Sequence, residues 1–276
     1  MAFHVGARHL NCTGPTDLND GDAMKFSANL GFLWTDRPLP DAIRAARAAG
    51  FDAVECHWPY DTPVDAVNAA LRDTGLPMLG LNTRRGNPGE NGLLALPGRE
   101  ADARAAIDQA IAYAVATGTG AIHVMAGNAS GPQARATFLD NLRYARAACP
   151  DDILLLIEPL NRHDAPQYFL RTTDQAADLL ADLADPGVKM MFDCYHVART
   201  EGDVVTRLEA LLPHVGHIQF AAVPDRGIPD QGELNYPFVF KRIAALGWTR
   251  PLGAEYRPGA DTDQSLDWLR AAKAGA

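Results

Sequence analysis

The sequence has few cysteines and no long apolar segment. Four cysteines, at positions 12, 56, 149 and 194, lie dozens of residues apart in a chain of 276 residues, without a C-x-x-C pair. This spacing is unlike a disulfide framework or a zinc knuckle, and it favours reduced thiols in a cytoplasmic protein. No apolar run reaches the roughly 18 residues that are needed to span a bilayer, so we expect no membrane segment.

Positive charge is also scarce. The chain carries 25 Lys and Arg residues against 34 Asp and Glu residues, which gives a formal net charge of −9. Nucleic acids and anionic membranes attract proteins through clustered Lys and Arg side chains. We therefore expect a small-molecule substrate, and neither a nucleic acid nor a membrane as a partner.

Two glycine signatures of common enzyme folds are missing. The first predicted strand, residues 26–30, leads into Gly31-Phe32-Leu33 instead of the G-x-G-x-x-G turn of a doubly wound dinucleotide-binding sheet. The G-x-S-x-G elbow of the serine hydrolases does not occur either. These absences argue against a doubly wound sheet and against a serine nucleophile.

Short apolar runs alternate with longer amphipathic stretches along most of the chain. Residues 153–157, ILLLI, form a continuous apolar run, as in parallel strands that are buried on both faces. The predicted strands are residues 26–30, 53–56, 77–81, 121–125, 153–157, 188–192, 215–220 and 252–256. The predicted helices are residues 40–50, 63–74, 99–117, 133–148, 173–183, 204–212, 237–246 and 262–274. This strict alternation predicts an α/β fold, a single (β/α)8 TIM barrel over residues 24–276.

Residues 1–23 precede this pattern. They are polar, rich in Gly, Asn and Asp, and lack the apolar core of a secretory signal. We expect them to form a poorly ordered N-terminal tail outside the barrel.

Polar side chains stand at the ends of four successive predicted strands in the second half of the chain. They are Glu158, Asp193, Gln219 and Glu255, and their separations of 35, 26 and 36 residues are each close to one βα repeat. Because chemistry in such barrels occurs where the strands end, we expect these side chains to converge. Three converging carboxylates repel one another unless a cation lies among them. Oxygen ligands suit a hard ion, so the pattern predicts a Mg²⁺ or Mn²⁺ site.

Three histidines lie close to these positions in the sequence. His196 follows Asp193 by three residues, in the predicted loop after the strand, where it could reach a substrate bound at the metal. His217 shares a strand face with Gln219, because side chains alternate along a strand, and is expected to support it. His123 lies inside the fourth predicted strand. It is either a core residue or a substrate-binding residue, and we predict the second role.

Several segments together resemble one enzyme family. The segments are GLLALPGRE at 92–100, HVMAG at 123–127, IEPLN at 157–161, FDCYH at 192–196, EGD at 201–203, HIQFA at 217–221, GELNYPFVF at 232–240 and EYRP at 255–258. In this order they resemble the hydroxypyruvate isomerase family, within the xylose isomerase-like TIM barrels, a superfamily of sugar isomerases and epimerases. The resemblance extends over residues 24–269.

The resemblance implies roles for particular residues. The family's metal ligands correspond to the four strand-end residues named above, and its catalytic pair corresponds to Glu158 and Glu255. His196 and Arg226 match substrate-contacting positions. One departure is the pair Arg84 and Arg85, where typical members have small or apolar residues. These charges either bind a longer or more anionic substrate, with Arg84 as a substrate-binding residue, or they face solvent.

The implied reaction is a metal-dependent isomerisation of the aldose–ketose type on a small hydroxy-oxo acid, with hydroxypyruvate to tartronate semialdehyde as the leading reaction. A base removes a proton beside a carbonyl, and the resulting enediolate is stabilised by a metal ion. Glu158 and Glu255 would serve as acid and base. Arg226 would fix the substrate carboxylate through paired hydrogen bonds.

Other activities of the same barrel remain alternatives. They are 2-oxo-tetronate isomerase, ketose 3-epimerase, a dehydratase and a non-catalytic sugar-binding protein. An apurinic endonuclease shares the fold, but it would need more histidine ligands and a basic DNA-binding face, which the net charge of −9 argues against. The loops around Trp34 and Trp58 are apolar enough to contact a second subunit, so the sequence is compatible with a homo-oligomer.

Overall fold

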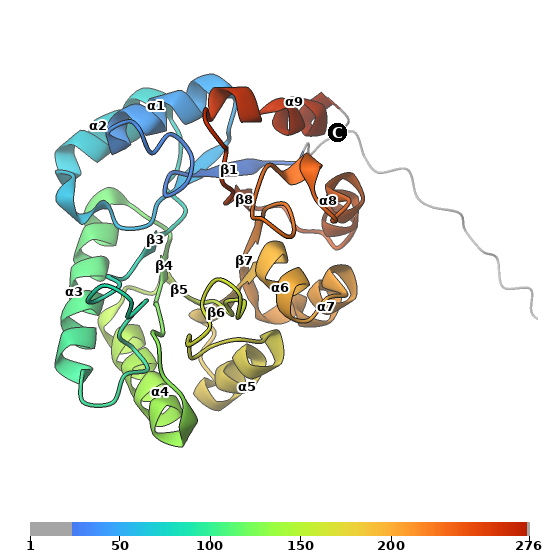
Figure 1. Ribbon diagram of the computed structural model, residues 1–276. Helices are drawn as coiled ribbons and strands as arrows, with labels where there is room; N and C mark the ends of the chain where they lie inside the picture. Colours follow the sequence, from blue (N-terminus) through green and yellow to red (C-terminus); the bar gives the residue numbers. More distant parts are fainter. Residues whose placement is uncertain (1–23, 275–276) are drawn as a thin grey trace, which may run out of the picture.

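The computed structural model describes residues 24–274, which form a barrel of parallel strands surrounded by helices (Figure 1). The strands follow the order β2-β1-β8-β7-β6-β5-β4-β3 in one eight-stranded sheet. Their bounds are β1 (Phe26–Asn29), β2 (Ala53–Glu55), β3 (Leu81–Asn82), β4 (Ala121–His123), β5 (Leu154–Ile157), β6 (Val188–Asp193), β7 (Val215–Phe220) and β8 (Leu252–Ala254). The predicted (β/α)8 barrel is confirmed. The predicted tail, residues 1–23, lies outside the described residues.

The sheet closes between β2 and the chain that precedes β3. The backbone N–H of Val54 donates to Pro77 O at 3.0 Å, and the N–H of Leu79 donates to Val54 O at 2.7 Å. Regular pairing with β4 begins only at Leu81, opposite Ile122. The predicted strand 77–81 was therefore wrong in its bounds. Pro77 has no backbone N–H to donate to a neighbouring strand. The apolar residues that follow it are nevertheless typical of a strand, which explains the prediction.

The helices cover the outside of the barrel (Figure 1). Their bounds are α1 (Leu39–Ala49), α2 (Val64–Thr74), α3 (Glu100–Thr117), α4 (Gly131–Ala148), α5 (Thr173–Leu183), α6 (Cys194–Thr200), α7 (Val204–Leu211), α8 (Tyr236–Ala245) and α9 (Asp267–Ala274). Gly50 follows α1 with φ = 94°, a left-handed conformation that glycine adopts without strain. No helix within residues 24–274 is both long and apolar enough to cross a membrane.

Helix α6 was missed in the sequence. It begins directly after β6, and the Asp193 carboxylate caps it by accepting the backbone N–H of Tyr195 at 2.8 Å. The predicted loop after the sixth strand is therefore wrong, and His196 lies on this helix. The predicted helix 262–274 is also divided, into a short 3₁₀ turn (Asp263–Ser265) and α9.

The main core lies between the strands and the helices. A cluster of aromatic rings in edge-to-face contact, formed by Phe26, Phe220, Phe240 and Trp268, joins β1 and β7 to α8 and α9. Trp34 also belongs to the core: it is 1% exposed, and its indole N–H donates to Asp263 at 2.8 Å. The Trp34 side chain is therefore covered by the chain itself and is not available to a partner, and the expected homo-oligomer stays a prediction.

Candidate active site

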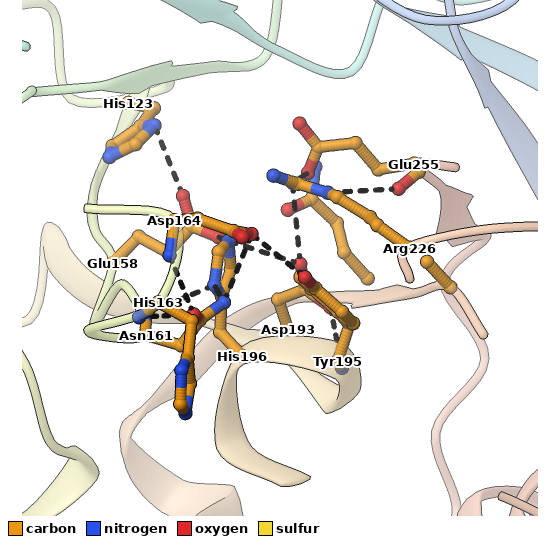
Figure 2. A network of polar contacts seen from close by, with 12 residues as sticks. His123, Glu158, Asn161, His163, Asp164, Asp193, Tyr195, His196, Arg226 and Glu255 are labelled. Carbon is orange, nitrogen blue, oxygen red and sulfur yellow. Dashed lines mark hydrogen bonds and ion pairs between the residues drawn. The ribbon is translucent and has the colours of Figure 1, made fainter. Parts of the chain in front are cut away.

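The four predicted strand-end residues come together at the carboxyl end of the barrel. Glu158 directly follows β5, Asp193 is the last residue of β6, Gln219 lies in β7, and Glu255 directly follows β8. The parallel register places Asp193 beside Gln219. Figure 2 shows Glu158, Asp193 and Glu255 turned toward one space, with His196 and Arg226 beside them.

Burial makes this group of carboxylates electrostatically costly. Glu158, Asp193 and Glu255 are at most 6% exposed. Burial, together with the charges of Glu255 and Asp193, raises the pKa of Glu158 well above its ordinary value. Burial also raises the pKa of Asp193 to about 7, even though the positive charge of Arg226 opposes the shift. A cation among these groups would remove most of this cost.

Arg226 supplies the one guanidinium that touches this acidic group within the described residues. Its Nη2 lies 3.1 Å from Glu255 Oε2 and 3.6 Å from Asp193 Oδ2. The same guanidinium is stacked over Phe32, 4.7 Å from the ring centre. Burial opposes the ionisation of Glu255, but the charge of Arg226 and a hydrogen bond from His57 outweigh it and lower the pKa of Glu255 to about 2. The structure therefore places Arg226, predicted as a substrate-binding residue, beside Glu255.

His57 holds the other oxygen of Glu255. Its Nε2 lies 2.9 Å from Glu255 Oε1, and the acceptor-only carboxylate requires this nitrogen to donate. Gly31 packs against the imidazole so closely that a Cβ at this position would collide with the ring. The glycine after the first strand therefore serves close packing at the site.

Five buried polar atoms in this region have no hydrogen-bond partner among the described residues. They are His123 Nε2, Glu158 Oε1, Asp193 Oδ2, His196 Nε2 and Gln219 Oε1. A buried polar atom without a partner costs about 1–3 kcal/mol, and a native protein seldom leaves several in one place. Their concentration at one point indicates that a ligand satisfies them.

The donor set fits a hard metal ion. Glu158, Asp193 and His196 each offer one possible ligand atom, and these atoms lie within 4.8 Å of one another. The buried group could therefore hold a metal ion. The carboxylate atoms Glu158 Oε1 and Asp193 Oδ2 and the amide atom Gln219 Oε1 are all unpartnered oxygens, and hard divalent cations prefer oxygen ligands.

Hydrogen bonds to Nδ1 decide what His196 can offer. The backbone N–H of Asn161 donates to His196 Nδ1 at 3.1 Å, and Asn161 Nδ2 lies 2.7 Å from the same nitrogen. The Asn161 Oδ1 accepts the backbone N–H groups of His163 and Asp164, so its Nδ2 must be the group that faces His196. Nδ1 therefore accepts, and the proton of the neutral ring is on Nε2. His196 Nε2 therefore has an N–H group to donate and no lone pair for a metal ion.

This assignment gives a direct test. We expect the long-range ¹⁵N–¹H spectrum at neutral pH to show a protonated, pyrrole-like Nε2 and an unprotonated, pyridine-like Nδ1 for His196. Burial lowers the pKa of His196 to about 3, so the ring should stay neutral across the physiological range. A spectrum with an unprotonated Nε2 would show that this nitrogen cannot donate a hydrogen bond. His196 would then be a candidate metal ligand.

Two residues of the site were not predicted as site residues. Glu55 ends β2 and contacts His217, with 2.6 Å between Glu55 Oε2 and His217 Nε2. His57, two residues later, holds Glu255. Glu158 and the other acids were predicted because they stand where a strand ends. Glu55 could have been predicted in the same way, because it is the last residue of the short strand β2 (Ala53–Glu55).

The remaining predicted substrate residues differ in position. His123 lies beside the acidic group, with Nδ1 3.6 Å from Glu158 Oε2. Arg84 is directed elsewhere: its Nε donates to Gln109 on α3, and its guanidinium lies 4.9 Å from the centre of the Tyr60 ring. The structure thus brings His123 to the site and places the Arg84 guanidinium against the outer helix layer.

Comparisons with known proteins identify the family of the chain. The family model described as xylose isomerase-like TIM barrel matches residues 43–272. The chain is 42% identical over 253 residues to the 2-oxo-tetronate isomerase of Cupriavidus necator, covering 89% of this chain and 97% of that protein. It is 35% identical over 253 residues to the hydroxypyruvate isomerase of Escherichia coli, covering 89% of this chain and 98% of that protein.

A solved structure gives the same fold. The crystal structure described as AP endonuclease, family 2, from Brucella melitensis is 34% identical, covers 90% of this chain and 98% of its own, and superposes with a TM-score of 0.86. The resemblance that the sequence motifs indicated is confirmed. The chain belongs to the xylose isomerase-like TIM barrel family, in which it groups with isomerases.

Proposed function

We propose that this protein is a metal-dependent isomerase of a small hydroxy-oxo acid, with hydroxypyruvate to tartronate semialdehyde as the leading reaction. The observation that supports it is the buried set of unpartnered oxygens from Glu158, Asp193 and Gln219 beside Glu255. The substrates named for the relatives, hydroxypyruvate and 2-oxo-tetronate, belong to the same chemical class. The buried free thiols of Cys56, Cys149 and Cys194 are consistent with the predicted cytoplasmic setting.

The proposed ligands of the metal are Glu158, Asp193, Gln219 and Glu255, and the proposed ion is Mg²⁺ or Mn²⁺. When bound, such an ion polarises a carbonyl oxygen and lowers the energy of the negative charge that develops on deprotonation. The residues present fit this role, because all four offer oxygen and because, among residues 24–274, only the Arg226 guanidinium contacts the acidic group and balances its charge.

The chain's own residues would move the protons. One glutamate removes a proton from the hydroxymethyl carbon of the substrate, and a proton returns to the neighbouring carbon. The hydroxyl proton moves to the former carbonyl oxygen, so that the ketone becomes a hydroxyl group and the hydroxymethyl group becomes an aldehyde. Glu255, with one oxygen on His57 and the other on Arg226, is held in one orientation for this transfer. Glu158 stands across the site as the second acid–base group, and the Nε2–H of His196 donates to a substrate oxygen.

Arg226 would bind the substrate carboxylate. It contacts the protein through Nη2 and Nε, so Nη1 is left for the ligand. We expect Arg226→Met to raise the KM for hydroxypyruvate by about 10- to 100-fold, since charge-assisted hydrogen bonds contribute about 1.5–3 kcal/mol. Steady-state kinetics at saturating Mg²⁺ measure this effect.

Arg84→Met is the matched variant. Because the Arg84 guanidinium lies against Gln109 and Tyr60, this change should leave the KM for hydroxypyruvate within twofold, and a raised KM for a 2-oxo-tetronate alone would show that Arg84 reaches longer substrates. Equal KM values for both substrates in Arg84→Met and wild type would remove Arg84 from substrate binding. A hydroxypyruvate KM unaffected by Arg226→Met would remove Arg226.

The experiment that tests the function is ¹H NMR in D₂O with Mg²⁺ and, separately, hydroxypyruvate, a 2-oxo-tetronate and a free ketohexose. We expect loss of the α-proton signal and appearance of the isomer with a hydroxy-oxo acid. Reaction of the ketohexose alone would indicate an epimerase, and loss of a hydroxyl group would indicate a dehydratase. Binding without any proton exchange would indicate a sugar-binding protein.

The endonuclease description of the Brucella structure offers a second candidate. In this chain the possible metal ligands of the acidic site are mainly oxygens. His196 presents the proton on Nε2 to the site, not a lone pair that could bind a metal ion. The net charge of −9 also disfavours a DNA backbone. We therefore expect no cleavage of a duplex that contains an abasic site, with Mg²⁺ or Mn²⁺ present. Cleavage that is lost in Asp193→Asn would favour the nuclease instead.

A further inference from the structure

We propose that Glu55 is a positioning residue that, together with His217, fixes which end of the Gln219 amide faces the metal site. Glu55 ends β2, and both His217 and Gln219 lie on β7, on the same face of that strand. Glu55 Oε2 lies 2.6 Å from His217 Nε2, and Gln219 Nε2 donates to Glu55 Oε1 at 3.3 Å. All three side chains are at most 7% exposed. This inference rests on the proposed role of Gln219 as a metal ligand.

A glutamine needs such a partner because its amide has two unlike ends. The oxygen can coordinate a cation, whereas the NH₂ group can only donate, and the two ends have nearly the same shape. An ionised carboxylate only accepts, so Glu55 selects the NH₂ end of Gln219. The oxygen is then left pointing away from Glu55, and it is one of the buried atoms without a partner at the site. Glu55 therefore fixes the ligand atom without touching the ion.

The surrounding strand is shaped for this contact. Gly253 of β8 lies opposite Gln219 in the sheet register. A Cβ at position 253 would collide with Glu55 Oε1 and lie 2.8 Å from both Gln219 Cγ and His217 Nε2. A side chain on the neighbouring strand would push the three groups apart. Glycine at this position therefore serves their close approach.

The geometry predicts what a neutral replacement does. In Glu55→Gln the new amide turns its oxygen toward His217 when the ring keeps its proton on Nε2, the state that the Glu55 carboxylate selects in wild type. Its NH₂ group then faces Gln219, which can satisfy it only by turning its own oxygen toward position 55. The Gln219 NH₂ group would then face the metal site, where it repels a cation.

The test is Mn²⁺ affinity measured by titration calorimetry in five chains: wild type, Glu55→Gln, Glu55→Asp, Gln219→Leu, and Gln219→Leu combined with Glu55→Gln. Outer partners of metal ligands typically change affinity by about 10- to 100-fold, and we expect a loss of that size in both Glu55 variants. Glu55→Asp keeps the charge but withdraws the carboxylate by one methylene. In the Gln219→Leu background we expect Glu55→Gln to change the affinity by less than threefold.

Other results would overturn the inference. A loss in Glu55→Gln with wild-type affinity in Glu55→Asp would show that only the charge acts. Wild-type affinity in both variants, or an equal loss of affinity in the Gln219→Leu background, would also contradict it. Thermal unfolding of the metal-free chains separates misfolding from loss of the ligand.

A readout that needs no metal separates this inference from the proposed function. The side-chain NH₂ resonances of Gln219, identified by their loss in Gln219→Leu, should be protected from exchange in wild type and shift in both Glu55 variants. If wild type does not bind Mn²⁺, the metal proposal is wrong. The Gln219 resonances would still show whether Glu55 orients the Gln219 amide. Unchanged Gln219 resonances in the Glu55 variants would end that role.

Discussion

Glu255→Gln should lower kcat by about 10²- to 10⁴-fold, the range typical for loss of a general base. The amide keeps the size of the side chain and an oxygen that can coordinate, but it no longer accepts a proton at neutral pH. Affinity for Mg²⁺ and for substrate should fall much less than turnover. The measurement is kcat at saturating Mg²⁺, together with exchange of the substrate α-proton into D₂O.

Glu209→Gln is the matched control for this change. Glu209 lies on α7, exposed and paired at 3.4 Å with Arg242, so its kcat should equal that of wild type. Unchanged kcat in Glu255→Gln would remove Glu255 from the mechanism. Full α-proton exchange without product would mean that Glu255 returns the proton, and would make Glu158 the base.

Asp193→Asn should abolish most of the stabilisation by Mn²⁺. At 100 times Kd, a ligand that binds only the native state adds about 2.7 kcal/mol, which corresponds to a rise in Tm of roughly 5–10 °C for a chain of this size. The variant keeps Oδ1 to cap α6 and replaces the free Oδ2 with an NH₂ group. It should therefore fold but show almost no rise in Tm when Mn²⁺ is added.

The metal-free proteins give the opposite order of stability. Burial raises the pKa of Asp193 to about 7 in the native state, well above its value of about 4 in an unfolded chain. Native Asp193 thus binds a proton that the unfolded chain has released, and wild type loses stability as the pH rises from about 4 to 7. An asparagine side chain does not ionise, so the variant does not lose stability in this way as the pH rises. Metal-free Asp193→Asn should therefore be more stable than metal-free wild type at pH 8. Identical melting of wild type with and without Mn²⁺ would contradict the metal proposal.

The barrel and the acids at its strand ends could be predicted because both follow local rules. ILLLI and the other apolar runs mark strands by composition, and in this fold the residue that follows a strand faces the carboxyl end. Glu158 and Glu255 were found in this way. Helix α6 was missed because it starts without a break after β6, and its capping residue, Asp193, was already interpreted as a metal ligand.

The contacts across the barrel could not be predicted from the sequence. Glu55 and His217 are 162 residues apart, and they meet only because β1 joins β2 to β8 when the sheet closes. The direction of Arg84 is a similar case: the side chain follows the packing of its loop on α3, which composition does not reveal. The proton position on His196 depends on Asn161, which lies 35 residues earlier.

The cap on α6 has a consequence for the choice of ion. Oδ1 of Asp193 accepts the N–H of Tyr195, whereas Oδ2 has no partner among the described residues, so an ion would meet this carboxylate through Oδ2 first. Ca²⁺ gathers six to eight oxygens and commonly takes both from a carboxylate, whereas Mg²⁺ needs six at shorter range. A helix that starts on a ligand thereby favours coordination through one oxygen of that ligand, and it biases the site against calcium.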